Sequence, residues 1–139
     1  MHHLLRRKDD QRGASAIEMA FVAPAFLILI FLIIEVALWM HARNAVLAAA
    51  REGVSQLRTA DPDASGKWQS FIEATSVKYA RELGAVQSPT ATADYDEGSR
   101  RVTVTVSGGI VDLIPGWDLT VSASSSGLIE VFHPDLGQQ

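Results

Sequence analysis

The sequence of 139 residues contains no cysteine, so neither a disulfide framework nor a thiolate metal site can form. The fold must therefore be held by packing and hydrogen bonds alone. Histidine is also scarce, and the four histidines do not fall at the i, i+4 or short-loop spacing that metal sites use. We predict that the chain holds no metal and no cofactor.

Positive charge is not in excess either, because the formal net charge is −4 and the basic residues are scattered. Nucleic-acid binders usually carry a basic patch that pairs with phosphates, so we predict no nucleic-acid partner. Apart from the adjacent His2 and His3 the histidines lie far apart, and no nucleophile, base and orienting group can be assembled around them. We predict no catalytic residue and a protein that is not an enzyme.

One long apolar run dominates the sequence, since residues 19–34 read MAFVAPAFLILIFLII without a charged side chain. Residues 14–40 together exceed the about 20 residues that a helix needs to cross a hydrocarbon core of about 30 Å. The rest of this small chain offers too little apolar surface to wrap such a helix. We predict a transmembrane helix in contact with membrane lipids, with Trp39 at the boundary to water.

Basic residues are more frequent before the apolar run than shortly after it, which favours a cytoplasmic N-terminus. The first group is Arg6, Arg7, Lys8 and Arg12, and the second is Arg43 and Arg51. We therefore expect a single-pass protein whose C-terminal part is extracytoplasmic.

Two carboxylates interrupt the apolar region, and a charge near the bilayer centre costs about 2.5–3.5 kcal/mol or more unless it is paired. Glu18 would become the fifth residue of the chain if the bond between Gly13 and Ala14 were cut, and its partner would then be a new α-amino group. Glu35 is a possible second membrane acid, and we expect it near the outer edge, where it reaches headgroups or water.

The helix is expected to continue over residues 41–59, outside the membrane, because apolar residues recur there at three- and four-residue spacing. Small residues on this stripe, among them Ala45, Ala49 and Gly53, would let another helix approach closely. That neighbour is either the chain's own domain or another subunit, and the pattern leaves both open.

Residues 60–139 are predicted to form a small α+β domain. A second helix is expected over Lys67–Leu83 with Gly84 as its cap, followed by three or four antiparallel strands. The expected strands are 90–95, 101–107, 119–125 and 128–132, with a hairpin turn at Asp96–Ser99, an apolar loop over 110–117 and a break at Gly127.

Residues 12–53 resemble the TadE-like segment of tight-adherence pilus proteins. The matching positions are Gly13, Ser15-Ala16-Ile17-Glu18, Ala20, Pro24, Glu35, Ala42-Arg43 and the closing Ala49-Ala50-Arg51-Glu52-Gly53. A glycine followed by this glutamate and an apolar run is the general type IV prepilin pattern, whereas the Ala-Ala-Arg-Glu-Gly ending indicates TadE. Met19 in place of an aromatic residue and the long C-terminal region favour a minor pilin, or pseudopilin, over the short major pilin.

The resemblance implies that an aspartic prepilin peptidase removes the basic leader 1–13, so that Ala14 becomes the new terminus. It further implies that Glu18 pairs with the terminal amine of a neighbouring subunit and sets the axial register. The implied partners are the peptidase, other pilin-like subunits, and the pilus assembly platform with its ATPase. The implied location is the bacterial cytoplasmic membrane or the pilus itself.

Two alternatives remain from the sequence. Ordinary signal peptidase could release a binding domain after Ala48-Ala49-Ala50, although this site lies farther beyond the apolar run than such signals usually allow. The chain could also be an uncleaved single-pass anchor for an envelope-binding domain. N-terminal sequencing of the membrane-extracted protein distinguishes all three.

We expect Gly13→Val to leave the chain in the membrane with its basic leader attached. Glycine has no Cβ and fits a tight, extended cleavage cleft, which a β-branched side chain obstructs. Mass spectrometry of the membrane-extracted protein measures the outcome. A variant that matures normally to an Ala14 terminus would contradict the prepilin interpretation.

Overall fold

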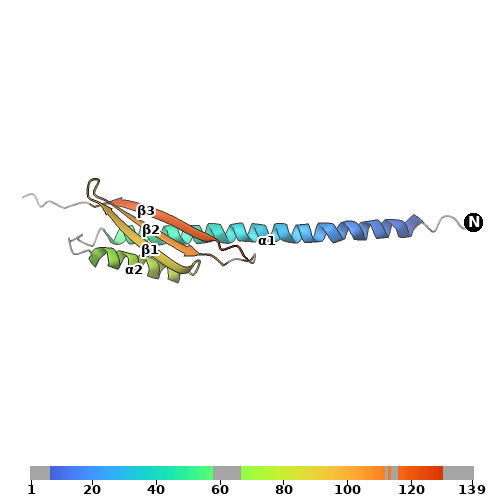
Figure 1. Cartoon of the computed structure of the whole chain (residues 1–139), viewed down its shortest axis with the longest axis horizontal. Helices are drawn as coiled ribbons and strands as arrows, with labels where there is room; N and C mark the ends of the chain where they lie inside the picture. Colours follow the sequence, from blue (N-terminus) through green and yellow to red (C-terminus); the bar gives the residue numbers. More distant parts are fainter. Residues whose placement is uncertain (1–6, 58–66, 112, 114–115, 130–139) are drawn as a thin grey trace, which may run out of the picture. The chain divides into compact units, whose positions relative to one another are not determined.

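A computed structural model describes residues 7–57, 67–111, 113 and 116–129 of the chain, with side chains from Ser15 onward. Its elements, in chain order, are α1 (Arg7–Gln56), α2 (Lys67–Glu82), β1 (Gln87–Asp96), β2 (Arg101–Gly109) and β3 (Thr120–Leu128) (Figure 1). The predicted α+β class is confirmed, with a long helix, a shorter helix and a three-stranded antiparallel sheet. The chain divides into two compact units, Met1–Ala37 and Leu38–Gln139.

Helix α1 has other bounds than the sequence suggested. It begins at Arg7 instead of Ala14 and ends at Gln56 instead of Thr59. Gly13 costs about 1 kcal/mol of helix propensity relative to alanine, which is too little to stop a helix of this length. The helix also runs through Pro24 without a break. Beyond its end, the N–H of Leu57 donates to the carbonyl of Val54 at 3.2 Å, which closes the last turn.

Helix α2 forms as predicted and buries one face. Trp68, Ile72, Ser76 and Ala80 recur at four-residue spacing and are buried, as expected for an amphipathic helix on a core. Gly84 adopts a φ of 65°, and its N–H donates to the carbonyl of Arg81 at 3.0 Å. This glycine in the left-handed conformation ends the helix. Its N–H satisfies the carbonyl of Arg81, which has no hydrogen-bond partner further along the helix.

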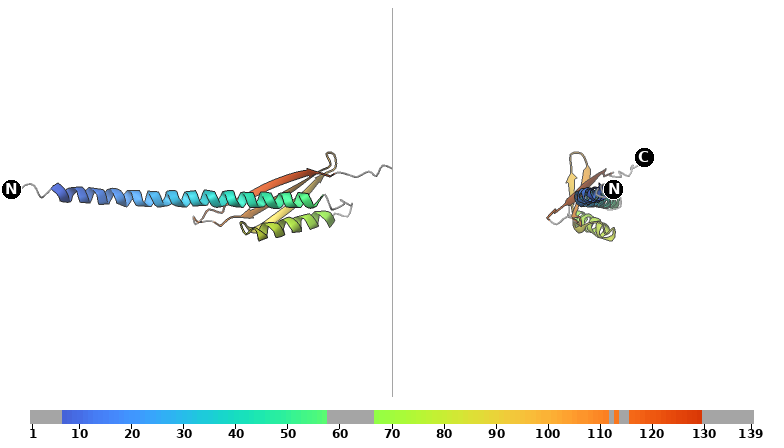
Figure 2. Two further views of the ribbon diagram at one scale, coloured as in Figure 1. Left: turned by 180° about the vertical axis from the view of Figure 1, so that it is seen from behind. Right: turned by 90° about the vertical axis from the view of Figure 1, so that its right-hand side faces the viewer.

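The sheet has the order β1-β2-β3, with both pairs antiparallel. In β2 the alternation of valine and threonine separates the two faces, since Val102, Val104 and Val106 are buried while the residues between them are not. Both helices lie on the buried face, as the two views of Figure 2 show for α2 and the second half of α1. The opposite face carries mainly threonine and serine hydroxyls, of which Thr90 and Ser107 share a hydrogen bond of 2.9 Å across β1 and β2.

The β1–β2 hairpin turns where predicted, and its geometry depends on Asp96. The Asp96 carboxylate accepts hydrogen bonds from the Ser99 hydroxyl at 2.6 Å and from the Gly98 N–H at 3.0 Å. These two bonds favour the charged form and hold the pKa of Asp96 below its ordinary value. Asp96 therefore has a local structural role, because its carboxylate holds the turn in which the chain reverses.

Two expectations about the strands are wrong. Strand β1 begins three residues before Thr90 and contains Pro89, which lies at a register irregularity of an edge strand, next to Ser88 with a φ of 44°. Proline is tolerated there because an edge residue at a bulge need not donate to the ladder. The α2 side chain Glu73 covers this edge, accepting a hydrogen bond from the N–H of Ala93 at 3.1 Å.

The expected break at Gly127 does not exist, because β3 runs through it and pairs Gly127 with Val102 in unbroken register. A Cβ at this position would lie 2.6 Å from the Val54 side chain of α1. The glycine therefore serves close packing between strand and helix and does not end the strand. Residues 130–132 of the expected last strand lie outside the described residues.

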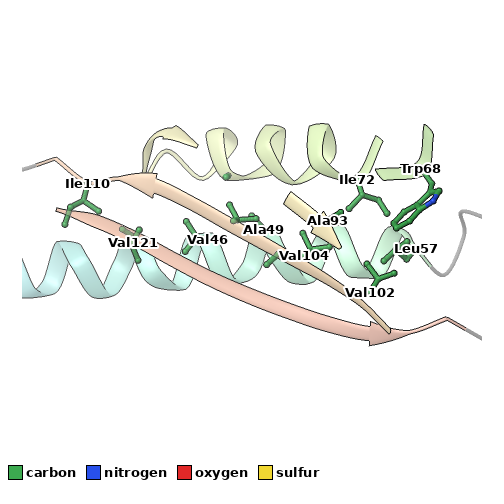
Figure 3. Close-up of a cluster of buried hydrophobic side chains, with 14 residues drawn as sticks. Val46, Ala49, Leu57, Trp68, Ile72, Ala93, Val102, Val104, Ile110 and Val121 are labelled. Atoms are coloured by element: carbon green, nitrogen blue, oxygen red, sulfur yellow. The ribbon is translucent and has the colours of Figure 1, made fainter. Parts of the chain in front are cut away.

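The core of the second unit joins the second half of α1, α2 and the sheet (Figure 3). Its members are buried and apolar: Ala42, Val46, Ala49, Ala50, Leu57, Trp68, Ile72, Ala80, Ala93, Val102, Val104, Val106, Ile110 and Val121. Helices α1 and α2 approach each other closely where a Cβ added to Gly53 would overlap the Ser76 hydroxyl. Among the described residues, this fully buried hydroxyl has no hydrogen-bond partner.

We expect Gly53→Ala to destabilise the folded domain by about 1–3 kcal/mol, which is the usual cost of overpacking a core. Ser76→Ala removes a buried hydroxyl without a partner and should be neutral or stabilising. Because the two atoms compete for one space, the double variant should recover most of the loss. Denaturant unfolding of the full chain in detergent measures all three, and strictly additive effects would disprove the steric coupling.

Candidate functional site

The first candidate region is the apolar part of α1. Among the described residues, α1 alone is long and apolar enough to cross a membrane, judged by length and composition. Only 6% of its most apolar window is buried, so this part of α1 is not packed in a protein core. Its large exposed side chains are Ile17, Met19, Phe21, Val22, Phe26, Leu27, Ile28, Leu29, Ile30, Phe31, Leu32, Ile33, Ile34 and Val36. A helix that is apolar on all sides and lacks protein cover is suited to act as a membrane anchor.

The second candidate region is the expected cleavage site and the glutamate after it. Gly13 lies within α1, so its backbone is helical in the uncut chain, while the side chain of Ala14 is outside the described side chains. Glu18 lies on the same helix, five residues beyond Gly13 and roughly 7.5 Å along the axis. Its side chain is exposed, so a group from outside the chain can reach the carboxylate.

Glu35 differs from Glu18 in its surroundings. We expected it to reach headgroups or water, but its side chain is buried, with 3% of its surface exposed. At about 100° per residue, the seventeen positions between the two acids place them on different faces of the helix. The structure does not bring Glu18 and Glu35 together, so they do not form one site.

The small residues of the later part of α1 face the chain's own core. Ala45 and Ala49 are buried, and Gly53 lies against Ser76 of α2 and Val104 of β2. Of the two neighbours that the sequence left open for this stripe, the chain's own domain is the one found in the structure. The stripe is therefore not a free surface for a second helix.

Two exposed features of the second unit were not recognised from the sequence. The guanidinium of Arg43 lies over the ring of Trp39, 5.8 Å from its centroid, in a cation–π contact. The loop between β2 and β3 exposes Val111, Leu113 and Trp117. The i, i+4 spacing of Trp39 and Arg43 could have suggested the first contact, whereas the exposure of an apolar loop depends on tertiary packing.

Comparison with known families supports the resemblance that was drawn from the residues. Residues 13–55 match the model of the family described as TadE-like protein. This span begins at Gly13 and contains the Ala-Ala-Arg-Glu-Gly ending, so the match covers the residues on which the predicted resemblance to TadE-like proteins rests. No curated protein and no solved structure matches the chain.

We expect the anchor to be sensitive to charge in its apolar middle. Replacing both Leu29 and Leu32 by aspartate should cost about 5–7 kcal/mol of insertion free energy and release the chain from membranes on alkaline carbonate extraction. The matched control is Ser122→Asp with Ser124→Asp, which adds the same charge to the exposed face of the sheet. Equal extraction of both double variants would contradict a membrane-spanning α1.

Proposed function

We propose that the chain is a minor pilin-like subunit that is anchored in the bacterial cytoplasmic membrane and supports assembly of a tight-adherence pilus after processing at Gly13. The observation that carries this proposal is that the TadE-like match begins at Gly13, just before the apolar part of α1, whose large side chains are exposed. Pilin-type subunits need this combination, because the same helix must reside in lipid before assembly and among other subunits afterwards.

A structural role fits better than a catalytic one. TadE-like proteins are pilin-related and generally structural, and the proposed interactions of this chain are with other proteins and with lipid. The proposed partners are a prepilin peptidase, other pilin-like subunits, and the assembly platform with its ATPase. In this arrangement the basic leader stays cytoplasmic and the α+β domain lies on the outer side.

Processing would act on a helical substrate, because α1 already includes Gly13. A peptidase that binds an extended segment must first unwind the helix locally around the bond that it cuts. Glycine lowers the cost of this step by about 1 kcal/mol relative to alanine, and the first turns of a helix fray most readily. In this proposal, Gly13 contributes both to the fit in the cleft and to the unwinding before it.

Glu18 is proposed to set the register between subunits. After cleavage, the new α-amino group of one subunit would pair with the exposed Glu18 carboxylate of its neighbour. In an environment of low dielectric constant the attraction between the two charges is much stronger than in water. An arrangement that leaves either charge without its partner is costly in free energy. The pairing therefore favours the one axial arrangement in which the two charges meet.

The structure bears on the signal-peptidase alternative. A cut after Ala50 would fall inside α1, in its last two turns, where Ala49 and Ala50 are fully buried. It would also separate the domain from Ala42 and Val46, which belong to its core. Release at this site is therefore disfavoured, while an uncleaved anchor remains the alternative that cleavage experiments must distinguish.

We expect Glu18→Ala to be inserted and cut after Gly13 as in the wild type, yet to abolish pilus formation. Removing the carboxylate lowers the cost of insertion but also removes the partner of the neighbour's amine. Immunoblots would follow processing and electron microscopy would score pili in a strain whose endogenous copy is deleted.

The matched control for Glu18→Ala is Glu82→Ala, which removes an exposed glutamate from α2 and should leave piliation unchanged. Wild-type numbers of pili in the Glu18→Ala strain would remove the register role. The membrane anchor would stand in that case, because it rests on the apolar helix.

A further inference from the structure

Strand β3 lies at an edge of the sheet, because the strand order is β1-β2-β3. In an antiparallel pair, successive residues direct their backbone groups to opposite sides of the strand. The N–H of Ile129 donates to the carbonyl of Arg100 at 3.0 Å, and the N–H of Ile110 donates to the carbonyl of Leu119 at 3.1 Å. With the unbroken register between them, these two bonds show that the odd-numbered positions of β3 bond to β2. The even-numbered positions therefore direct their N–H and carbonyl groups to the outer edge.

The outer edge of β3 is open. No strand formed by the described residues pairs with it. The residues that direct backbone groups to this edge are all exposed: Thr120, Ser122, Ser124, Ser126 and Leu128. The strand contains neither a charged residue nor a proline, and its register with β2 has no irregularity. It therefore presents an uninterrupted row of N–H and carbonyl groups.

The other edge of the sheet, at β1, is protected. Pro89 has no N–H to offer and lies at the register irregularity between Gln87 and Thr90. The N–H of Ala93 donates to the carboxylate of Glu73, on α2, at 3.1 Å. Natural sheets protect their edges with prolines, irregularities, charges or covering elements, because an unpaired edge pairs readily with other chains. Since β3 has none of these features, we expect its edge to be paired in the working protein.

A strand added to this edge would meet a different surface on each face of the sheet. On the outer face it would lie beside the hydroxyls of Ser122, Ser124 and Ser126. On the inner face it would lie beside Gly127, against which the half-buried Val54 of α1 packs. An added strand therefore fits best when apolar residues on its inner face alternate with hydroxyl residues on its outer face. Strand β2, on the other side of β3, has this alternation of valine and threonine.

A second copy of the chain fits this edge poorly. Within the second unit, α1 runs from Val46 to Leu57 in the same direction as β3 runs from Val121 onward (Figure 3). A symmetric pair of two β3 strands is antiparallel, so it would run the two α1 helices in opposite directions. Subunits anchored in one membrane carry α1 in the same direction, and the other edge of a second copy is the protected one. The open edge is therefore suited to a different protein.

We propose that the outer edge of β3 is a docking site for an extended segment of a different protein, which adds to the sheet as an antiparallel strand. Backbone hydrogen bonds between Thr120 and Leu128 hold the segment, and its alternation of apolar and hydroxyl side chains decides which segments fit. The inference goes beyond the proposed function and uses only the anchoring part of it, to exclude a second copy. This contact belongs to the α+β domain and is separate from the pairing proposed for Glu18.

A peptide with the sequence of residues 101–109, RVTVTVSGG, is the probe, because β2 pairs antiparallel with β3 in the fold. Opposite residues of an antiparallel pair lie on the same face of the sheet. At the outer edge, the threonine N–H groups of the peptide would therefore bond to β3, and its valine N–H groups would point away. Methylating the peptide nitrogens that correspond to Thr103 and Thr105 should abolish binding. Methylating those that correspond to Val104 and Val106 should leave binding unchanged.

Binding is measured by the fluorescence anisotropy of the labelled peptide with the full chain in detergent micelles, and empty micelles give the background. Ser124→Pro removes an N–H that faces the outer edge, so it spares the ladder with β2, while the proline ring obstructs the added strand. We expect this variant to weaken peptide binding by about tenfold or more. Ser124→Ala keeps the N–H and is the matched control, which should bind like the wild type.

Circular dichroism and denaturant unfolding show whether both variants are folded. If Ser124→Pro does not fold, the two methylated peptides decide with the wild-type chain alone. Equal binding by the wild type and a folded Ser124→Pro would overturn the site. Loss of binding on methylation of the valine nitrogens would mean that the peptide displaces β2, and this also overturns it.

The remaining outcomes concern the occupant of the edge. Absence of peptide binding at about 1 mM would overturn the docking site. A mass of two chains in sedimentation that Ser124→Pro reduces to one would assign the edge to a second copy and overturn the proposal. These results leave the proposed function intact, because processing at Gly13 and pilus formation in the Glu18→Ala strain test that function separately.

Discussion

The domain depends on the burial of small side chains along the second half of α1. The sheet has a single apolar face and α2 has a single apolar stripe, and each needs a surface to cover it. Ala42, Val46, Ala49 and Ala50 provide that surface, and their small size lets the strands and α2 approach the helix closely. The same helix contributes its earlier residues to the exposed apolar run. One continuous element therefore carries an exposed apolar run over part of its length and contributes to a protein core over the rest.

Much of the fold could be predicted because its signals are local. The four-residue spacing of buried residues and the cap at Gly84 located α2, and the alternation of valine with threonine located β2. The errors occurred where a residue has a local preference that a distant contact overrides. By itself Gly127 suggests a break in the strand. In the structure Val54 of α1 packs so closely against this position that a side chain with a Cβ would not fit. Pro89 suggests the boundary of a strand, but an edge position with a register irregularity accommodates it inside β1.

The candidate site also combines features that are visible in the local sequence with features that depend on tertiary contacts. Gly13 and Glu18 could be singled out from the sequence because the proposed cleavage and pairing need particular residues at a particular spacing, and the TadE-like match spans both positions. The burial of Glu35 could not be found in this way, because a position along a helix does not show what packs over it. The apolar character of residues 110–117 was visible in the sequence, but not that Val111 and Trp117 remain exposed in the fold. Composition identifies an unusual segment, and only the tertiary structure tells whether that segment is core or surface.

The contact between Gly53 and Ser76 also has a consequence for how this sequence can diverge. The two positions share one volume, so the residue allowed at one depends on the residue present at the other. A lineage that acquires alanine at position 53 first would pass through a less stable intermediate, whereas one that first loses the hydroxyl at position 76 would not. We therefore expect the two positions to covary among homologous chains and to change in that order.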